Sequence, residues 1–438
     1  MSAKTAFSKN HTRLLTIVAL YACSASLAFG QLVNGRFITS VYTWKQYDTV
    51  DVSKTYARGF QSVLLDVAQN DFSLHGHFQG AVMLQSKLDE LPDYRLYYGY
   101  AQWKNIADVA DLSFGRVPFF VGVGSGTIDG ALTRLNFMDK SVRLTLYGGA
   151  NTPLDMTIKE WGPLNKNFTV GGQILMTALD EWRFGLSYMN RQRERPGYWA
   201  LRADSLFNPT TLYVDPNQTK EQYASGDISY SLPNIGFRVR YDYNIDYEKT
   251  QRGQVGVRYY PSDEWIVSAE YLHRAPRLFS NSFFAVFNAH TTDEMEGGVD
   301  YIVMPSVRTY VRGAYVQYSG DNSFRYTVGV ANDYASASYR GSTGYAGELS
   351  TISLQGSYPL CERMFIPTAG VSFTSYKLNV ADNTENTLAA TLGLIARPLQ
   401  MLSIDVQGQW LKNKVYENDV RLYVGLNIWF TERLHLFE

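Results

Sequence analysis

Polar and apolar residues alternate along this chain one position at a time, in one segment after another. In Asn70–Gln85 (NDFSLHGHFQGAVMLQ), one set of alternate positions is apolar or glycine and the other is mostly polar. The same two-residue period returns in Gly236–Glu248, Leu402–Lys412 and Asp419–Phe430. Successive side chains of a β-strand point to opposite faces, so this period predicts strands with one apolar and one polar face. No stretch has a convincing 3.6-residue period, and we therefore expect an all-β fold.

Two kinds of connection join these segments, and they largely alternate along the chain. The first kind is tight and places Pro, Asn or Asp where a turn favours them, as in Leu232-Pro233-Asn234 and Met304-Pro305. The second kind is longer and polar: Asp48–Ala57, Ser86–Asp93, Asn151–Asn167, Pro196–Glu221, Ala275–Thr291 and Asn379–Glu385. Tight turns at one end and longer loops at the other describe an up-and-down antiparallel meander, and no linker divides it.

The first thirty residues differ from the rest and predict a secretory signal peptide over residues 1–30. A basic region with Lys4, Lys9 and Arg13 precedes the apolar run Leu14–Ala22, and small residues stand just before Gln31. Removal of this segment leaves residues 31–438, which we expect to form one barrel domain.

The two cysteines limit the covalent chemistry of the chain. Cys23 lies inside the predicted signal peptide and follows a loose match to a bacterial lipobox, so whether it carries lipid stays open. With residues 1–30 removed, only Cys361 remains. The mature chain can then form neither an internal disulfide nor a cysteine-rich metal site.

Composition and charge indicate what surrounds the apolar faces. Charged residues make up 18% of the chain, against about 25% in average soluble domains, and aromatic residues make up 14%. One predicted strand face carries four charges: Arg238, Arg240, Asp242 and Asp246. Such a face is too charged to pack as a dry core. The apolar faces have no evident partner sheet or covering helix, and Trp residues recur near strand ends, as in the aromatic girdles of membrane barrels.

A sheet in hydrocarbon must close on itself, because no water satisfies the backbone groups at its edges. We therefore predict a closed antiparallel up-and-down transmembrane β-barrel with an even number of strands, about 16–22. Both termini should lie at the end with the tight turns. The alternative, a secreted soluble multi-sheet protein, would leave the apolar faces without a partner.

The stretch Leu112–Ala131 (LSFGRVPFFVGVGSGTIDGA) resembles Gram-negative outer-membrane porins, specifically the porin-like barrels related to phosphate- and alginate-type channels. In those proteins a strand ending in Gly-Arg-x-Pro precedes a glycine-rich loop, an Asp-Gly pair and a returning strand. The matching residues here are Gly115, Arg116, Pro118, Gly126, Asp129 and Gly130. The resemblance implies that Phe119–Ile128 folds into the pore as a loop and narrows it, with Arg116 nearby. The family's C-terminal aromatic residue is displaced here, since Thr431–Glu438 follows Phe430.

These expectations define two sets of candidate residues. The candidates for a pore constriction are Arg116, Phe119, Phe120, Asp129 and Arg134. The candidates for lining an aqueous lumen are His75, His77, Arg143, Arg183, Arg238, Arg240, Asp242, Asp246, Arg252, Arg258, Arg308, Arg312 and Asp405. Rings of like charge select ions by sign, whereas this mixture of signs is expected to orient polar solutes.

The sequence contains no recognisable catalytic, metal or cofactor motif. His75 and His77 share one strand face, but no third ligand is evident, so no metal site is assigned. None of the histidines after residue 30 belongs to a nucleophile motif. Gly122–Gly126 lacks the Lys and the helix of a phosphate loop. We expect no enzyme and no cofactor, and the near-zero net charge gives no reason to expect nucleic acid.

The sequence thus predicts a passive porin in the outer membrane of a Gram-negative bacterium. Small polar or charged solutes would diffuse through a mixed-charge lumen narrowed by an inward-folded loop. The partners would be outer-membrane lipid, lipopolysaccharide and the barrel-assembly machinery, with a homo-oligomer left open. The alternative is a barrel sleeve or scaffold that holds a periplasmic or surface partner of an electron-transfer or secretion complex.

Overall fold

The structure is a computed structural model that describes residues 31–49, 52–86, 92–194, 198–203, 209–214, 219–277, 290–345, 347–377 and 382–434. The strands in these ranges are β1 (Gln31–Thr49), β2 (Val52–Gln69), β3 (Phe72–Gln85), β4 (Tyr94–Ile106), β5 (Ala110–Val121), β6 (Gly124–Phe137), β7 (Val142–Asn151), β8 (Phe168–Leu179), β9 (Trp182–Arg193), β10 (Tyr198–Ala203), β11 (Pro209–Val214), β12 (Thr219–Ser231), β13 (Ile235–Asn244), β14 (Lys249–Tyr259), β15 (Trp265–Arg274), β16 (Thr292–Met304), β17 (Val307–Tyr318), β18 (Asp321–Asn332), β19 (Ala335–Gly344), β20 (Glu348–Ser357), β21 (Phe365–Lys377), β22 (Glu385–Leu399), β23 (Leu402–Lys412) and β24 (Asp419–Leu434). The signal peptide expected over residues 1–30 lies outside the described residues. In the part of the chain that the structure describes, no helix is long and apolar enough to cross a membrane.

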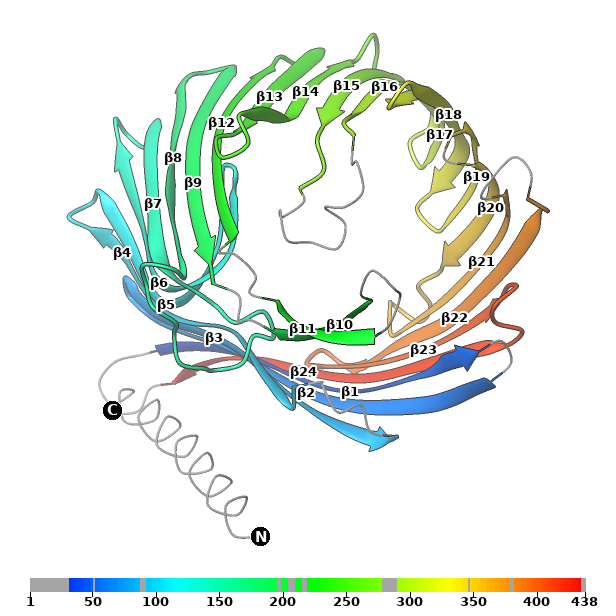
Figure 1. The fold of residues 1–438 in the computed structure, drawn as a ribbon, viewed down its shortest axis with the longest axis horizontal. Helices are drawn as coiled ribbons and strands as arrows, with labels where there is room; N and C mark the ends of the chain where they lie inside the picture. The colour runs from blue at the N-terminus through cyan, green and yellow to red at the C-terminus, as the bar shows by residue number, and fades with distance from the viewer. Residues whose placement is uncertain are drawn as a thin grey trace.

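A single 22-stranded sheet closes into a barrel (Figure 1). Neighbouring strands follow the chain order and pair antiparallel, except that β9 pairs with β12 across the intervening hairpin. The ring closes where β1 pairs with β24, from Gln31↔Leu434 to Thr43↔Leu422. β10 and β11 form a separate two-stranded sheet, which appears within the outline of the ring in Figure 1. The predicted closed up-and-down barrel is confirmed, at the upper end of the expected strand count.

Short turns join the strands at one end of the barrel, and both described chain ends lie there. Gln31 pairs with Leu434, and the next residue of β1 pairs with Ala68 beside the β2–β3 turn. At the opposite end, the expectation of a long connection over Asp48–Ala57 is wrong, because β1 and β2 pair as far as Thr49↔Val52. Thr and Tyr residues there favour strand formation and extend the paired hairpin.

The two faces of the wall differ in polarity, as the alternation predicts. Ile352, Leu354 and Leu392 lie on one face and are 51%, 49% and 70% exposed. Residues between them, such as Ser353 and Thr391, lie on the opposite face. Large apolar side chains are thus exposed along the wall rather than packed in a central core. The two buried apolar clusters found among the described residues occur where the β5–β6 hairpin meets the wall.

Neighbouring substitutions on β22 test which face contacts hydrocarbon. An Arg on the lipid face near the bilayer midplane costs about 2–4 kcal/mol. Leu392→Arg is therefore expected to lower the free energy of unfolding in lipid vesicles by about that amount. Thr391→Arg, on the opposite face, is expected to change it by less than about 1 kcal/mol. Urea unfolding followed by heat-modifiable gel mobility measures both, and equal losses would contradict the assignment of the faces.

Candidate functional site

The end of the β5–β6 hairpin leaves the barrel wall and lies against the inner face of β7, β8 and β9. β5 pairs with β4 only as far as Arg116, whereas β5 and β6 stay paired up to the turn Gly122–Val123. The amide of Val123 donates a 2.9 Å hydrogen bond to Oγ of Ser187 on β9. Ser187 follows Leu186, which is exposed on the apolar face, so the hairpin contacts the other face of the wall. The hairpin end therefore lies inside the ring.

Apolar contacts hold the hairpin end against this wall. Phe119 stacks on Tyr147 of β7, with 4.3 Å between the ring centroids. Six buried residues form one cluster: Val117, Phe119, Val121, Ile128, Leu132 and Tyr147. At the tip, Val123 is buried with Met189 of β9 and Tyr223 of β12. The expectation that Phe119–Ile128 is a loop is wrong in its secondary structure, because burial of every second side chain keeps the segment paired as strands.

Glycines allow the β5–β6 hairpin to bend away from the wall and lie on its inner face. Gly130 of β6 pairs with Gly149 of β7. A Cβ on Gly130 would lie 2.2 Å from the carbonyl oxygen of Gly148 and 2.5 Å from the Cα of Gly149. Gly115 has a φ of +128°, and a Cβ there would lie 2.5 Å from the carbonyl oxygen of Gly99. Backbones approach this closely only where side chains are absent, so Gly115 and Gly130 mark where the hairpin leaves the wall.

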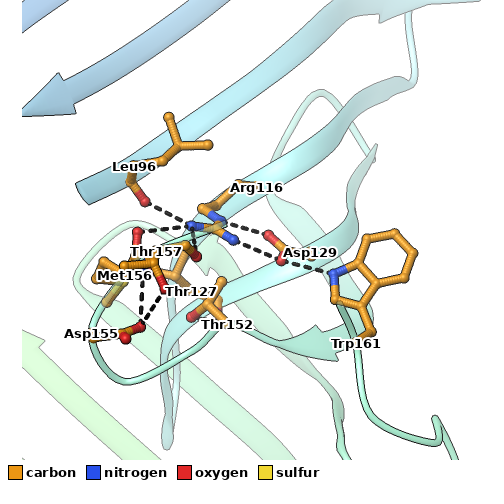
Figure 2. Close-up of polar contacts among 9 residues, drawn as sticks. All are labelled: Leu96, Arg116, Thr127, Asp129, Thr152, Asp155, Met156, Thr157 and Trp161. Atoms are coloured by element: carbon orange, nitrogen blue, oxygen red, sulfur yellow. Dashed lines mark hydrogen bonds and ion pairs between the residues drawn. The ribbon is translucent and has the colours of Figure 1, made fainter. Parts of the chain in front are cut away.

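Arg116 joins three segments at the base of the hairpin (Figure 2). Its Nε and Nη2 donate to the two carboxylate oxygens of Asp129 at 2.7 and 3.0 Å, a bidentate ion pair. Its Nη1 donates to the carbonyl oxygens of Leu96 (2.9 Å), Met156 (3.3 Å) and Thr157 (3.3 Å). The side chains of Arg116 and Asp129 are only 5% and 10% exposed. The guanidinium is thus compensated and fixes β4, β6 and the loop after β7 to one another.

The loop 152–167 between β7 and β8 lies over this ion pair. Nε1 of Trp161 donates a 3.0 Å hydrogen bond to Oδ2 of Asp129. Oγ1 of Thr152 donates to the carbonyl oxygen of Thr127 at 3.1 Å. The amide of Leu96 on β4 also donates a 2.8 Å hydrogen bond to the carbonyl oxygen of Met156, so the loop joins the hairpin to β4.

A second ion pair stiffens the same loop. The carboxylate of Asp155 accepts hydrogen bonds from Lys159 (2.5 Å) and from the hydroxyl of Thr157 (2.8 Å). Burial opposes the charged form of Asp155, but these hydrogen bonds outweigh burial and lower its pKa to about 2. Asp155 is therefore charged throughout the neutral pH range.

The constriction candidates divide between the hairpin and the wall. Arg116, Phe119 and Asp129 come together in the hairpin, where the first and last form the ion pair. Phe120 is 88% exposed on the hairpin face that points away from the clustered residues. Arg134 lies beyond Gly130 on β6, in register with an acidic residue of β5, and so belongs to the barrel wall. Their role in a pore constriction stays a prediction.

The lumen candidates, Asp246 excepted, lie on the strand face opposite the exposed apolar residues: His75, His77, Arg143, Arg183, Arg238, Arg240, Asp242, Arg252, Arg258, Arg308, Arg312 and Asp405. Asp246 lies in the β13–β14 turn, where its carboxylate is 3.1 Å from Nζ of Lys220. Whether these residues line a conducting lumen stays a prediction.

Ion pairs on this face join some of these charges. Nε of Arg240 donates to Asp242 at 2.9 Å, and Asp242 is fully buried. Two cavities follow the same face, with volumes of about 740 and 570 Å³. Charged groups line the first (Arg183, Arg238, Arg258, Arg312, Glu270, Glu296 and Asp300) and the second (Arg308, Arg312, Arg325, Arg340 and Glu296). Basic groups therefore outnumber acidic ones along this part of the wall.

His75 belongs to a hydrogen-bonded Ser–His–Asp chain that the sequence did not reveal. Its Nδ1 lies 2.5 Å from Oδ1 of Asp66, and its Nε2 lies 2.9 Å from Oγ of Ser73. Nucleophilic catalysis requires an accessible hydroxyl and donors for an oxyanion. Ser73 is buried in a strand that is paired on both sides. We therefore interpret this chain as structural. His77 stacks on Tyr97, and no three metal-binding side chains converge among the described residues.

Comparisons with known proteins concern the fold. No protein-family model matches the chain, and no curated protein is significantly similar to it. A mutant of the ferric enterobactin receptor (PfeA) from Pseudomonas aeruginosa is 10% identical, with a TM-score of 0.56 over 92% of this chain and 81% of that chain. A BenF-like porin from Pseudomonas fluorescens Pf-5 is 8% identical, with a TM-score of 0.42 over 93% and 100%. The P pilus usher (PapC) translocation pore is 8% identical, with a TM-score of 0.45 over 91% and 99%. The likeness to the receptor supports the large closed barrel and nothing about activity.

Several residues of the site escaped the sequence reasoning. Gly149 follows another glycine within a strand segment, a local signal for a close backbone approach that we did not use. Trp161 lies in a polar connection with no periodic pattern, so nothing local predicts its bond to Asp129. Tyr223 and Arg277 are far apart in sequence, and they come into contact because the chain after β15 passes across β14 and β13 toward β12.

Replacing Gly130 tests the close approach of β6 and β7. Gly130→Ala places a methyl group against backbone atoms that no rotamer change can relieve, at an expected loss of about 3 kcal/mol in the free energy of unfolding. Gly297→Ala is the matched control, since a Cβ there meets nothing within 4 Å. Urea unfolding of both variants in detergent measures the difference. Equal stability of the two variants would contradict the close approach of β6 and β7 at Gly130.

Removing the Arg116 guanidinium tests whether its hydrogen bonds to the carbonyl oxygens of Met156 and Thr157 hold loop 152–167 in place. Arg116→Ala leaves Asp129 buried without its partner, which typically costs about 3–5 kcal/mol. Loss of the carbonyl contacts should also release the loop, so that trypsin cleaves after Lys159 and Lys166 faster than in the parent protein. Arg363→Ala, in an exposed turn before β21, is the control and should leave loop cleavage unchanged. Unaltered cleavage in Arg116→Ala would show that the Arg116 side chain does not hold the loop.

Proposed function

We propose that this chain is an outer-membrane channel of a Gram-negative bacterium through which small polar or charged solutes diffuse passively. The observation that carries the proposal is a closed 22-stranded barrel whose outward face is apolar and whose inner face is polar and charged. Hydrocarbon would bury the outer face, and water would fill the interior. The β5–β6 hairpin, with Arg116, Phe119, Phe120 and Asp129, would narrow the passage.

Charge on the inner face supports passage of hydrated solutes. Side chains such as Arg308 and Arg340 line an inner cavity, and exposing them to apolar contents would be costly. A water-filled interior removes that cost. Arg134, a constriction candidate in the wall part of β6, would contribute to the electrostatic potential of the lumen together with the lumen candidates.

A sleeve that holds a partner protein is the second candidate. The width of a 22-stranded barrel favours it, because known barrels of that size hold a plug in the lumen. In the described ranges, the β5–β6 hairpin and the start of the connection after β15 reach across the inner wall, and β10–β11 also appears within the outline of the ring (Figure 1). The part of the interior outside these segments would be left for solvent or for a partner.

Single-channel recording of the purified protein in a planar bilayer tests the proposal. The parent protein is expected to give stable conductance without any partner. Removing Pro118–Thr127 and joining Val117 to Ile128 through a two-glycine turn should increase the conductance, because the segment that enters the ring is lost. Gly297→Ala should match the parent protein. Absence of conductance, with a second protein co-purifying in stoichiometric amount, would favour the sleeve and refute the channel.

A further inference from the structure

The chain that follows β15 also turns toward the interior. The amide of Ala275 donates a 2.9 Å hydrogen bond to the carbonyl oxygen of Gln251 on β14, and the Gln251 side chain donates back to the carbonyl of Ala275. Both residues are buried. Two residues later, the guanidinium carbon of Arg277 lies 4.8 Å from the ring centroid of Tyr223 on β12. Because β13 separates β14 from β12, the segment 275–277 crosses the wall toward the β5–β6 hairpin.

Tyr223 is where the two inward segments meet. Its side chain is 4% exposed and forms a buried cluster with Val123 of the hairpin tip and Met189 of β9. Asn244 lies 3.4 Å from the Tyr223 hydroxyl and 3.5 Å from the Gln251 side chain, which links the ring to the segment after β15. Arg277 therefore stands beside the hairpin tip on a rigid, buried support.

Arg277 differs from Arg116 and Arg191, the neighbouring cations, which each contact a carboxylate. Arg116 is paired with Asp129. Arg191 contacts Glu221 at 3.8 Å and donates to the carbonyl oxygen of Ser125. Arg277 is exposed, and no carboxylate among the described residues forms an ion pair with it. A cation–π contact places the guanidinium but leaves its charge in effect.

We propose that Arg277, held on Tyr223 next to the hairpin tip, is the residue that sets the charge selectivity of the narrowed passage and favours anions. This inference rests on the proposed channel function. Arg116 is not expected to set the selectivity, because the carboxylate of Asp129 cancels the Arg116 charge at short range. Arg116 is instead a positioning residue that fixes the hairpin.

Reversal potentials in a potassium chloride gradient across a planar bilayer test the proposal. The parent channel should favour chloride. Arg277→Gln should lower the chloride-to-potassium permeability ratio by about sixfold, because one unit charge at a distance of roughly 8 Å in water changes the local concentrations of the two ions about 2.4-fold each, in opposite directions. Arg277→Lys, which keeps the charge, should retain the parent ratio, and Arg277→Glu should move it further toward potassium. Arg363→Gln removes a positive charge in an exposed turn and serves as the control.

The outcomes separate this inference from the channel proposal. If the parent protein does not conduct, the channel proposal fails and the inference fails with it. If it conducts and Arg277→Gln has the same permeability ratio as Arg363→Gln, the channel proposal stands and Arg277 is not the determinant. Tyr223→Leu gives an independent test, because loss of the ring should release Arg277 and lower selectivity in the same direction. Unchanged selectivity in Tyr223→Leu, with heat-modifiable mobility retained, would contradict the placement by the ring.

Discussion

Closure of the sheet is the constraint on which the rest of the structure depends. The hydrogen-bonded pairing of β1 with β24 leaves no free edge in the 22-stranded ring, so backbone groups along the wall are paired by neighbouring strands. In a solvent that cannot hydrogen-bond, each unpaired backbone group would cost several kcal/mol, which an open sheet could not compensate. Closure also gives the wall two sides with different surroundings, and the two-residue alternation then assigns every side chain to one of them. The exposed apolar residues on one face are consistent with that assignment.

The inward hairpin uses the same alternation for another purpose. On β5 and β6, the residues that would otherwise face the interior become a packed layer against β7–β9, and they include some of the most buried apolar side chains described. Gly115 and Gly130 permit the hairpin to bend away from the wall, and the Arg116–Asp129 ion pair joins β5 to β6 at its base. The buried ion pair is costly unless its hydrogen bonds are satisfied, and here three carbonyl oxygens and one indole N–H supplement it. The main role of the Arg116–Asp129 pair is therefore to position the hairpin, not to place a free charge in the interior.

Periodicity predicted the elements of the wall and could not predict what enters the ring. The pattern over Leu402–Lys412 gives β23 with the same bounds, because successive residues of a strand face opposite sides of the wall. Phe119–Ile128 was placed inward only through its resemblance to porins, and its strand pairing was missed because glycines interrupt the pattern. The contact of Arg277 with Tyr223 depends on tertiary proximity that no local signal encodes. The β10–β11 hairpin is local, but its strand-forming residues lie within the polar connection expected over Pro196–Glu221. Charged candidates were found readily, but their ion pairs depend on cross-strand register, which sequence alone leaves open.

The central claim is that hydrocarbon surrounds the barrel and water fills it, and accessibility along one strand measures this most directly. Cys361, the free cysteine outside residues 1–30, lies exposed in a turn and would be replaced by Ser. Single cysteines would then be placed from Asp405 to Gln409 on β23 in vesicle-reconstituted protein and treated with a charged maleimide. The account predicts labelling at positions 405, 407 and 409 and protection at 406 and 408. Uniform labelling, or the reverse alternation, would contradict it.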